Sequence, residues 1–269
     1  MPLSTLSTKR SELAMGTVVT IEVARPEAED AIERALGWFH SIEACCTRFR
    51  PESELMRLVA QPGIPFRASP VLFEAVQFAV MVAEASDGAF DPTMKGDGYC
   101  DIELDPKRRT IRLHRPHALD LGAVAKGFAV DIAARELTPL ENFAIDAGGD
   151  LFFGGKNAQG EPWSVGVSHP RRDGELIRTV RLSNRAVCTS GDYERGQHIL
   201  DPRTGEPAVD VVSATVVAPS AMLADALATA AFVLGPEKGI EFLEQMSVVG
   251  LIFTPDLRCF ETGGWEDVA

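Results

Sequence analysis

The segment Ser220-Ala-Met-Leu-Ala-Asp225-Ala-Leu-Ala-Thr229-Ala-Ala-Phe-Val-Leu234 is apolar or Ala at nearly every position. A helix that is apolar on every side is normally buried, so this pattern predicts a helix inside the fold. After the opening serine, Asp225 and Thr229 are its two polar residues. They are four positions apart and therefore share one face, about one turn apart.

These two residues carry the first functional hypothesis. A buried carboxylate is costly unless a cation or several hydrogen-bond donors meet it. Asp225 and Thr229 therefore have the character of two oxygen ligands directed at a hard metal ion. The alternative is that Asp225 pairs with a Lys or with backbone amides, while the Thr229 hydroxyl bonds back to its own helix.

A second segment, Leu119–Asp131, places a lysine inside an apolar helical stretch. Lys126 is difficult to solvate there unless the start of the helix lies at a cleft. The amides near Gly122 and Ala123, together with Lys126, would suit an anion such as a phosphate. The alternative is that Asp120 is a plain N-cap and that Lys126 extends to water.

A third segment runs from Thr189 to Arg195 and continues as His198–Gly205. It is dense in turn-forming and reactive side chains. Loops that carry His, Asp, Arg and Ser beside rigid strands often carry chemistry. The alternative is a hairpin whose Asp-Pro and Thr-Gly pairs are only turn residues.

Composition limits the classes of function. The 269 residues are 45% hydrophobic and 24% charged, as in an ordinary globular protein. The formal net charge of −13 argues against a general binder of nucleic acid or anionic membranes. An anionic ligand would need a local positive site, for which Lys126, Arg203 and a bound divalent cation are candidates.

The sequence also bears on location. No apolar core of an export signal and no run of about 18 apolar residues is visible. The five cysteines are Cys45 and Cys46, which are adjacent, and Cys100, Cys188 and Cys259, which lack metal-site spacing. An odd number of cysteines favours reduced thiols. We therefore expect a cytoplasmic protein without a membrane span.

Periodicity and turn residues divide the chain into helices and strands. Helices are predicted to begin at Pro26, at Ser69-Pro70, within the Asp120 segment, at Ser220 and at Pro236. Strands are predicted at residues 16–24, 110–113, 143–145, 151–153, 163–167, 177–182, 186–188, 209–217, 248–253 and 257–260, and a loop at 91–109. Their irregular alternation indicates an α+β fold.

Two common nucleotide-binding folds are disfavoured, because the sequence contains neither a G-x-G-x-x-G fingerprint nor a Walker A motif. We see no clear linker. We therefore expect a single compact unit over residues 1–269, in which residues 1–14 form a loosely ordered N-terminal segment.

Six short blocks occur in a fixed order along the chain. They are Met15-Gly-Thr17, Ser86–Thr93, Asp120–Asp131, Asp146–Asp150, Thr189–Arg195 with His198–Gly205, and Val217–Thr229. Each block is weak alone, but the ordered set is specific. From about Met15 to Phe253 the chain resembles the ApbE family, the FAD:protein FMN transferases. The resemblance implies one ApbE-like domain of α+β, T-fold-like architecture.

The resemblance also implies a reaction. FAD is cleaved at its pyrophosphate, FMN passes to a Thr or Ser hydroxyl of an acceptor flavoprotein, and AMP leaves. Such a displacement needs a divalent cation, groups that orient the phosphates, and a base for the hydroxyl proton. The expected cofactor is Mg²⁺, with FAD as substrate and no nucleic acid as partner.

Site residues follow from the same resemblance. The metal ligands implied are the side chains of Asp225 and Thr229 and the main-chain carbonyl of Ala123, which suit Mg²⁺. The implied FAD contacts are Met15, Phe49, Ala89, Phe90, Asp91, Asp120, Lys126 and Ile199.

His198 is the predicted catalytic base, because its ordinary pKa lies near neutrality and it stands beside Ile199. Asp201 and Arg203 could orient it or the phosphates. The other histidines rank lower. His40 lies on a helix that reads as structural, and the remaining three, His114, His117 and His169, stand beside Pro or Arg in expected surface loops.

Two departures from the family pattern bear on function. Phe49 replaces the usual Tyr and so loses a hydroxyl hydrogen bond. After Asp91-Pro-Thr, a longer family loop shrinks to Met94–Tyr99, which could leave the pocket more open. An open pocket favours an alternative activity, a Mg-dependent FAD pyrophosphatase with water as acceptor. A flavin-binding protein without turnover is the third hypothesis, although storage needs neither the Asp225–Thr229 pair nor His198.

Overall fold

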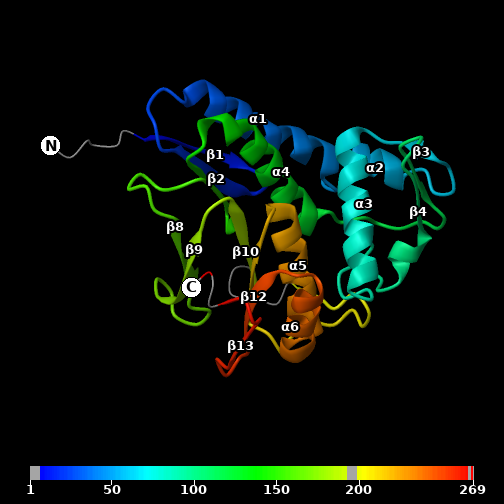
Figure 1. The fold of residues 1–269 in the computed structure, drawn as a ribbon. Coiled ribbons are helices and arrows are strands. Elements are labelled where there is room, and N and C mark those ends of the chain that lie inside the picture. Colours follow the sequence, from blue (N-terminus) through cyan, green and yellow to red (C-terminus); the bar gives the residue numbers. More distant parts are fainter. Residues whose placement is uncertain (1–6, 193–198, 266–267, 269) are drawn as a thin grey trace.

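The computed structural model describes residues 7–192, 199–265 and 268, within which the largest element is an antiparallel sheet of eight strands (Figure 1). The strand order is β1-β2-β6-β7-β10-β11-β12-β13. These strands are β1 Thr8–Ala14, β2 Thr17–Val23, β6 Phe143–Ala147, β7 Asp150–Gly154, β10 Arg185–Gly191, β11 Ser213–Ala218, β12 Val249–Phe253 and β13 Cys259–Glu261.

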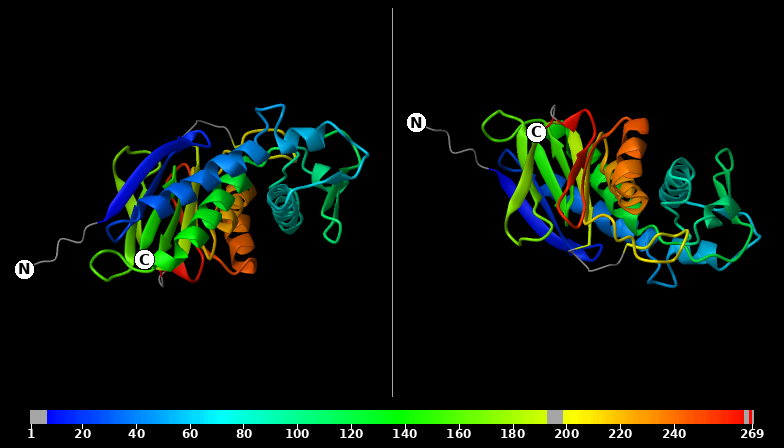
Figure 2. Two further views of the ribbon diagram at one scale, coloured as in Figure 1. Left: turned by 90° about the horizontal axis from the view of Figure 1, so that it is seen from above. Right: turned by 90° about the horizontal axis from the view of Figure 1, so that it is seen from below.

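Both faces of this sheet are covered (Figure 2). Helices α1 Glu29–Cys46, α4 Gly122–Leu137 and α5 Ala221–Leu234 pack on one face, and α6 Pro236–Gln245 follows α5. A two-stranded ribbon of β8 Trp163–Ser168 and β9 Leu176–Leu182 covers the other. Its buried Val165, Val180 and Leu182 pack with Val187 and Leu251 of the sheet in a second, smaller core.

A smaller part of the molecule lies beyond the C-terminal end of α1 (Figure 1). It contains α2 Glu54–Val59, α3 Pro70–Ala85 and a sheet of order β3-β5-β4, with β3 Phe66–Arg67, β4 Ile102–Asp105 and β5 Thr110–Leu113. Short 3₁₀ turns occupy Gly98–Asp101 and Thr138–Leu140. Leu58, Leu72 and Ile111 of this part are fully buried and belong to the same core as the helices on the large sheet.

Local sequence explains where the helices of this part begin. Ser69 Oγ accepts a hydrogen bond from Leu72 N at 3.2 Å, and Pro70 occupies the first helical position of α3. Ser53 caps α2 in the same way, through Met56 N at 3.1 Å. Both arrangements satisfy amides that a helix start leaves without partners.

The predicted burial of α5 is confirmed. Buried residues surround the helix from Ala221 to Val233, and it packs against α4, α6, β10 and β11. The interior strand β11 is buried at all six positions, and α5 packs on it and on its neighbour β10. The α+β class expected from the sequence is likewise confirmed by this mixed architecture.

Three element predictions are wrong, and the short elements α2 and β3 were not predicted. Residues 8–14 are not loosely ordered but form β1, an exposed edge strand that pairs with β2 across the Met15-Gly16 turn. The loop expected over 91–109 contains the 3₁₀ turn and β4, held by pairing with β5. Strand β11 begins at Ser213 rather than at Val209. Polar edge strands and short helices lack the periodicity on which such predictions rest.

Two further features concern the chain as a whole. None of the helices formed by the described residues has the length and apolar character needed to cross a bilayer. All five cysteines are free.

Candidate functional site

The site is built where α4 and α5 cross at very short range. A Cβ on Gly127 of α4 would lie 2.6 Å from Ala221 O and 2.7 Å from Met222 Cα of α5. Only a residue without a side chain permits such an approach. The crossing places Lys126 of α4 within electrostatic reach of Asp225 of α5.

A buried polar group, which we call the Lys126 cluster, lies beside this crossing. It consists of Lys126, Asp150 at the start of β7, Cys188 of β10 and Asp225. Lys126 Nζ lies 3.1 Å from Asp150 Oδ2 and donates to Gly148 O at 3.3 Å. Asp150 is also a hydrogen-bonding neighbour of Asp225, so two carboxylates share one ammonium group.

Burial and charge set the protonation of the cluster. Burial raises the pKa of Asp150 above its usual value, although the Lys126 charge opposes this. Burial alone would lower the pKa of Lys126, but the charges of Asp150 and Asp225 outweigh it and raise that pKa. Burial and the same two carboxylates raise the pKa of the Cys188 thiol well above its usual value. Lys126 is therefore charged and Cys188 neutral at physiological pH.

The donor set at this place fits Mg²⁺. Asp225 supplies a buried carboxylate, and Thr229 supplies a hydroxyl whose Oγ1 lies 3.1 Å from Ser190 Oγ. Ala123 departs from helical geometry at φ −86° and ψ 15°, so its carbonyl does not follow the regular helical direction. Hard oxygen donors of these kinds are the ligands that Mg²⁺ prefers.

The charge balance supports the same conclusion. The hydrogen bond between Asp150 and Asp225 requires one proton on the pair, and a divalent cation would allow both groups to be ionised beside the single ammonium of Lys126. Within the described parts of the chain, no three His, Cys, Asp or Glu side chains gather where they could hold a metal. An ion bound here would therefore depend on neutral oxygens, such as those of Thr229 and Ala123, beside the carboxylate of Asp225.

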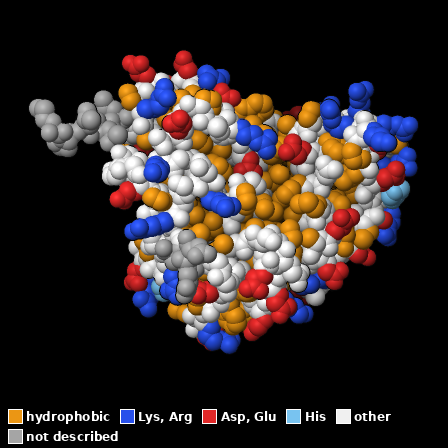
Figure 3. Space-filling view, in the orientation of Figure 1, with side chains coloured by type: hydrophobic (Ala, Val, Ile, Leu, Met, Phe, Trp, Pro, Cys, Tyr) orange, Lys and Arg blue, Asp and Glu red, His pale blue; other side chains and the backbone are white. Residues whose placement is uncertain are grey.

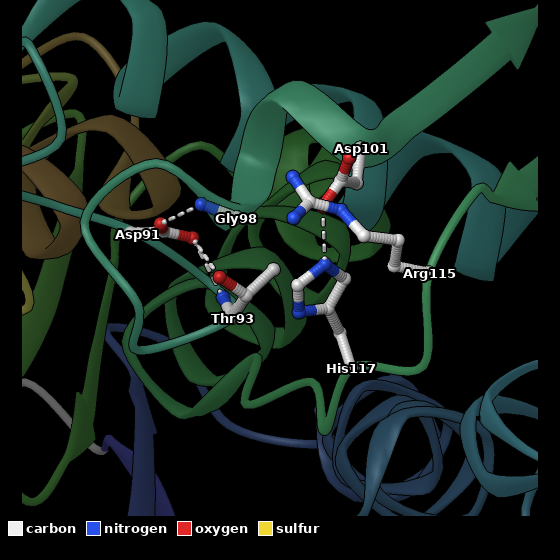
Figure 4. Close-up of polar contacts among 6 residues, drawn as sticks. All are labelled: Asp91, Thr93, Gly98, Asp101, Arg115 and His117. Atoms are coloured by element: carbon white, nitrogen blue, oxygen red, sulfur yellow. Dashed lines mark hydrogen bonds and ion pairs between the residues drawn. The ribbon is translucent and has the colours of Figure 1, made fainter.

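The predicted FAD contacts after α3 are buried, and Asp91 braces a loop (Figure 4). Asp91 Oδ1 accepts hydrogen bonds from Thr93 N at 2.7 Å and Thr93 Oγ1 at 2.8 Å, and Oδ2 accepts from Gly98 N at 3.1 Å. Its two neighbours in the prediction, Ala89 and Phe90, are also buried. The Asp91 carboxylate is thus already engaged in holding residues 91–98.

A histidine-carboxylate pair lies beside that loop (Figure 4). The Asp101 carboxylate accepts from His117 Nε2 at 2.7 Å and lies 2.8 Å from Arg115 Nε. The hydrogen bond from His117, helped by Arg115, lowers the pKa of Asp101. His117 Cε1 would lie 3.2 Å from a Cβ on Gly98. His117 lies in the expected loop between β5 and α4, but its ring is largely covered because it packs against the 91–98 loop.

The family model described as the ApbE family matches residues 15–97 and 94–253. The chain belongs to the ApbE family. It is 33% identical over 318 residues to the FAD:protein FMN transferase of Treponema pallidum, covering 96% of this chain and 87% of the relative. It is 30% identical over 291 residues to that of Vibrio cholerae, covering 90% and 86%. The crystal structure of the ApbE protein from Thermotoga maritima superposes with a TM-score of 0.89 at 28% identity, covering 97% of this chain and 98% of that one.

In this ApbE family member, Arg48 joins two of the predicted FAD contacts. Phe49 is 81% exposed, and the Arg48 guanidinium carbon lies 4.8 Å from its ring centroid. Arg48 Nε also lies 3.1 Å from Asp120 Oδ2. Asp120 Oδ1 accepts from Gly122 N at 2.8 Å, while Leu121 is the N-cap of α4. Asp120 therefore forms a local turn before the helix and is not its N-cap.

The shortened loop after Thr93 packs against a neighbouring turn. A Cβ on Gly96 would lie 2.6 Å from Arg203 Cα, so the loop touches the backbone of the Asp201–Gly205 turn. In that turn, Arg203 Nε and Nη2 donate to Asp201 at 2.8 and 2.7 Å, and this lowers the pKa of Asp201. Both side chains are engaged with each other.

Three predicted site residues remain to be placed, Met15, Ile199 and His198. Met15 lies in the turn between β1 and β2 with φ 52°, and Ile199 packs against the large core. His198, the predicted base, lies outside the described residues. On the face shown in Figure 3, apolar side chains gather between the part that contains the large sheet and the part that contains α3.

Sequence reasoning assigned no role to Asp150, Arg48 or Asp131. Asp150 belongs to a block that carried the family resemblance. Its partner Lys126 lies in a different element, so their ion pair could not be read from either segment alone. Asp131 is buried against α5, and no local pattern marks that contact. An Asp embedded in an apolar helix is the signal that could have drawn attention to it.

Proposed function

We propose that this chain is an FAD:protein FMN transferase that requires Mg²⁺, transfers FMN to a Thr or Ser hydroxyl of an acceptor flavoprotein, and releases AMP. The proposal is supported by membership of the ApbE family and by relatives that carry the transferase name. The observation that carries it is the Lys126 cluster beside Thr229 and Ala123, where buried carboxylates meet one ammonium group.

The proposed reaction balances without a redox partner. The acceptor oxygen forms a bond to the phosphorus of the FMN half, and the bond from that phosphorus to the bridging oxygen breaks. The bridging oxygen leaves with AMP, and the acceptor hydroxyl gives its proton to a base. When bound, Mg²⁺ would neutralise charge on the diphosphate oxygens.

The chain's own residues take three roles in this proposal. Asp225, Thr229 and the Ala123 carbonyl would hold the ion. The charged ammonium group of Lys126 would orient the phosphates. His198 would accept the hydroxyl proton. FAD would contact the eight positions that the family resemblance names: Met15, Phe49, Ala89, Phe90, Asp91, Asp120, Lys126 and Ile199.

We add Arg48 to the proposed FAD site. Its guanidinium lies over exposed Phe49 and against Asp120, both in the predicted set. It brings a positive charge to a protein whose net charge is −13. Both carboxylate oxygens of Asp91 already accept hydrogen bonds from Thr93 and Gly98. Asp91 would therefore contribute to FAD binding by holding the backbone of the 91–98 loop in place.

Transfer is favoured over hydrolysis by the relatives, which carry the transferase name. The argument for a pyrophosphatase rested on an open pocket after Thr93. Gly96 of this loop packs on the backbone of Arg203, so the loop is held against the Asp201–Gly205 turn. A cytoplasmic location remains a prediction from the sequence.

The test is incubation of the purified protein with FAD, Mg²⁺ and candidate acceptor flavoproteins from the same host, followed by intact-mass measurement. We expect an acceptor that gains one FMN, equimolar AMP, and no reaction in EDTA. Free FMN with no adduct on any acceptor would replace transfer by hydrolysis. Unchanged FAD in the presence of Mg²⁺ would overturn the proposal.

A further inference from the structure

Asp131 of α4 caps the first turn of α5 from outside that helix. Asp131 Oδ1 accepts a hydrogen bond from Ala221 N at 2.6 Å, and Oδ2 accepts one from Met222 N at 3.0 Å. The carboxylate is only 6% exposed. The first helical amides otherwise lack partners within their own helix, so this contact joins two helices by two charge-assisted bonds.

The two other amides of the first turn are satisfied within the segment itself. Leu223 N donates to Ser220 Oγ at 3.3 Å, and Ala224 N donates to Ser220 O at 3.1 Å. All four amides at the start of α5 are therefore paired. Since Asp131 occupies two of them, this helix start serves to attach α5 to α4.

Asp131 and Gly127 act at the same contact. They are four residues apart on α4, so they share the face that meets α5. Gly127 lets the backbones touch at Ala221 and Met222, and Asp131 bonds to the amides of the same two residues. Close packing fixes the separation of the helices, and the two hydrogen bonds fix how α5 is shifted along α4.

The proposed metal ligands come from both helices of this contact, Asp225 from α5 and Ala123 from α4. Asp225 follows Ala221 by four residues, about one helical turn or 6 Å along α5. On α4, Lys126 is adjacent to Gly127, and Ala123 is one turn earlier. Any shift of α5 along α4 would therefore move Asp225 relative to Lys126 and the Ala123 carbonyl.

We propose that Asp131 is a positioning residue of the metal site, which acts by fixing the first turn of α5, and with it Asp225, against α4. This inference rests on the proposed metal-dependent transfer. A carboxylate is required because each of its oxygens can accept one amide. An Asn accepts through one oxygen only, and its NH₂ group would face the second N–H.

The test compares Mn²⁺ binding in the wild type and Asp131→Asn, with Thr262→Val as the matched control. Thr262 follows β13 and is buried, and its Oγ1 accepts from Gly250 N at 3.0 Å, so the control also leaves one buried amide unpaired. Free Mn²⁺ is measured by electron paramagnetic resonance, well below the melting temperature of each protein. FAD affinity and the kcat and KM for FMN transfer are measured in parallel.

We expect Asp131→Asn to weaken Mn²⁺ binding by about 10- to 100-fold, the range typical when a residue that orients a ligand is lost. FAD affinity should change by less than about threefold, and kcat should recover partly at high Mg²⁺. Thr262→Val should lose stability and keep its Mn²⁺ affinity. This difference separates positioning from a merely structural role.

The outcomes distinguish the two proposals. If the wild type binds Mn²⁺ and transfers FMN while Asp131→Asn matches Thr262→Val, the positioning role is wrong and the proposed function stands. If the wild type neither binds Mn²⁺ nor cleaves FAD, the proposed function fails and this inference fails with it. Should Asp131→Asn not fold, Asp131→Ser is measured instead, and an unchanged Mn²⁺ affinity in that variant overturns the inference.

Discussion

Lys126 Nζ lies 3.1 Å from Asp150 Oδ2, and this ion pair joins helix α4 to strand β7 in the interior of the protein. Asp150 is almost completely buried, and Asp225 is its neighbour. An ammonium group that holds two buried carboxylates has structural as well as chemical consequences.

The first prediction concerns Lys126→Met. Removal of one partner leaves a buried charge without compensation, which costs about 3–5 kcal/mol. We expect the free energy of unfolding at pH 7, measured by urea denaturation, to fall by that amount. The double variant Lys126→Met/Asp150→Asn should recover much of it. As a control, Arg34→Met breaks an exposed pair with Glu136 and should cost about 0–1 kcal/mol. A similar small loss in Lys126→Met would contradict the role of this pair.

The second prediction concerns Asp225→Asn. The substitution keeps the shape of the side chain but removes the charge proposed to hold Mg²⁺. FMN transfer should fall by at least about 100-fold, and the rise in melting temperature on addition of Mg²⁺ should disappear. In EDTA the variant should melt no lower than the wild type, because a buried carboxylate beside Asp150 is gone. Full transfer by this variant would remove Asp225 from the metal site.

The burial of α5 could be predicted from sequence because its composition leaves no polar face to turn toward water. The shared face of Asp225 and Thr229 followed from helical spacing alone. The partner of Lys126 could not be found in this way, since Asp150 is 24 positions away and its contact depends on how β7 lies against α4. Family resemblance located the block around Asp150 but assigned it no role.

The same difference between local patterns and long-range contacts explains what the sequence analysis missed. Strand β1 is largely exposed and polar, so its pairing with β2 left no apolar alternation to detect. The contact of the shortened loop with the backbone of Arg203 could not be predicted either, because Arg203 lies about a hundred residues later in the sequence. Local patterns predict elements and faces, whereas contacts between distant segments require the fold.

The third prediction uses that loop contact. Gly96 has φ 75°, and a Cβ there would lie 2.6 Å from Arg203 Cα, so Gly96→Ala must displace backbone. We expect a loss of about 1–3 kcal/mol in unfolding free energy and a larger change in KM for FAD than in kcat. Gly63→Ala is the control, because Gly63 has φ 80° but no atom within 4 Å of the added Cβ. Equal effects of the two variants would show that strain at Gly96, and not its packing, matters.

The fourth prediction concerns His198. As a base near neutrality, it should make the rate of FMN transfer rise with pH through its pKa. His198→Ala should lower kcat by about 10²- to 10⁴-fold while FAD still binds. Stopped assays for AMP and fluorescence titration with FAD check the two parts separately. If FAD affinity collapses and the rate per bound FAD is unchanged, His198 is a binding residue.

The last prediction concerns the pH dependence of stability through Asp131. Burial raises the pKa of this carboxyl to about 6, from 3.8 in an exposed chain, although the Met222 and Ala221 amides and the nearby Arg135 and Ser220 oppose the rise. The folded protein therefore binds this proton more tightly than the unfolded chain does. Its contribution to stability is complete below about pH 4 and is lost as the pH rises through about 6.

The magnitude follows from the same shift. Between pH 4.5 and 7.5, the wild type should lose about 2 kcal/mol of unfolding free energy relative to Asp131→Asn, which has no group to titrate there. Contributions of other groups cancel in this difference. Urea denaturation of both proteins at several pH values measures it. A difference that stays constant with pH, or that grows in favour of the wild type as pH rises, would show that the folded protein holds Asp131 ionised across this range, with its two amide hydrogen bonds outweighing the cost of burial.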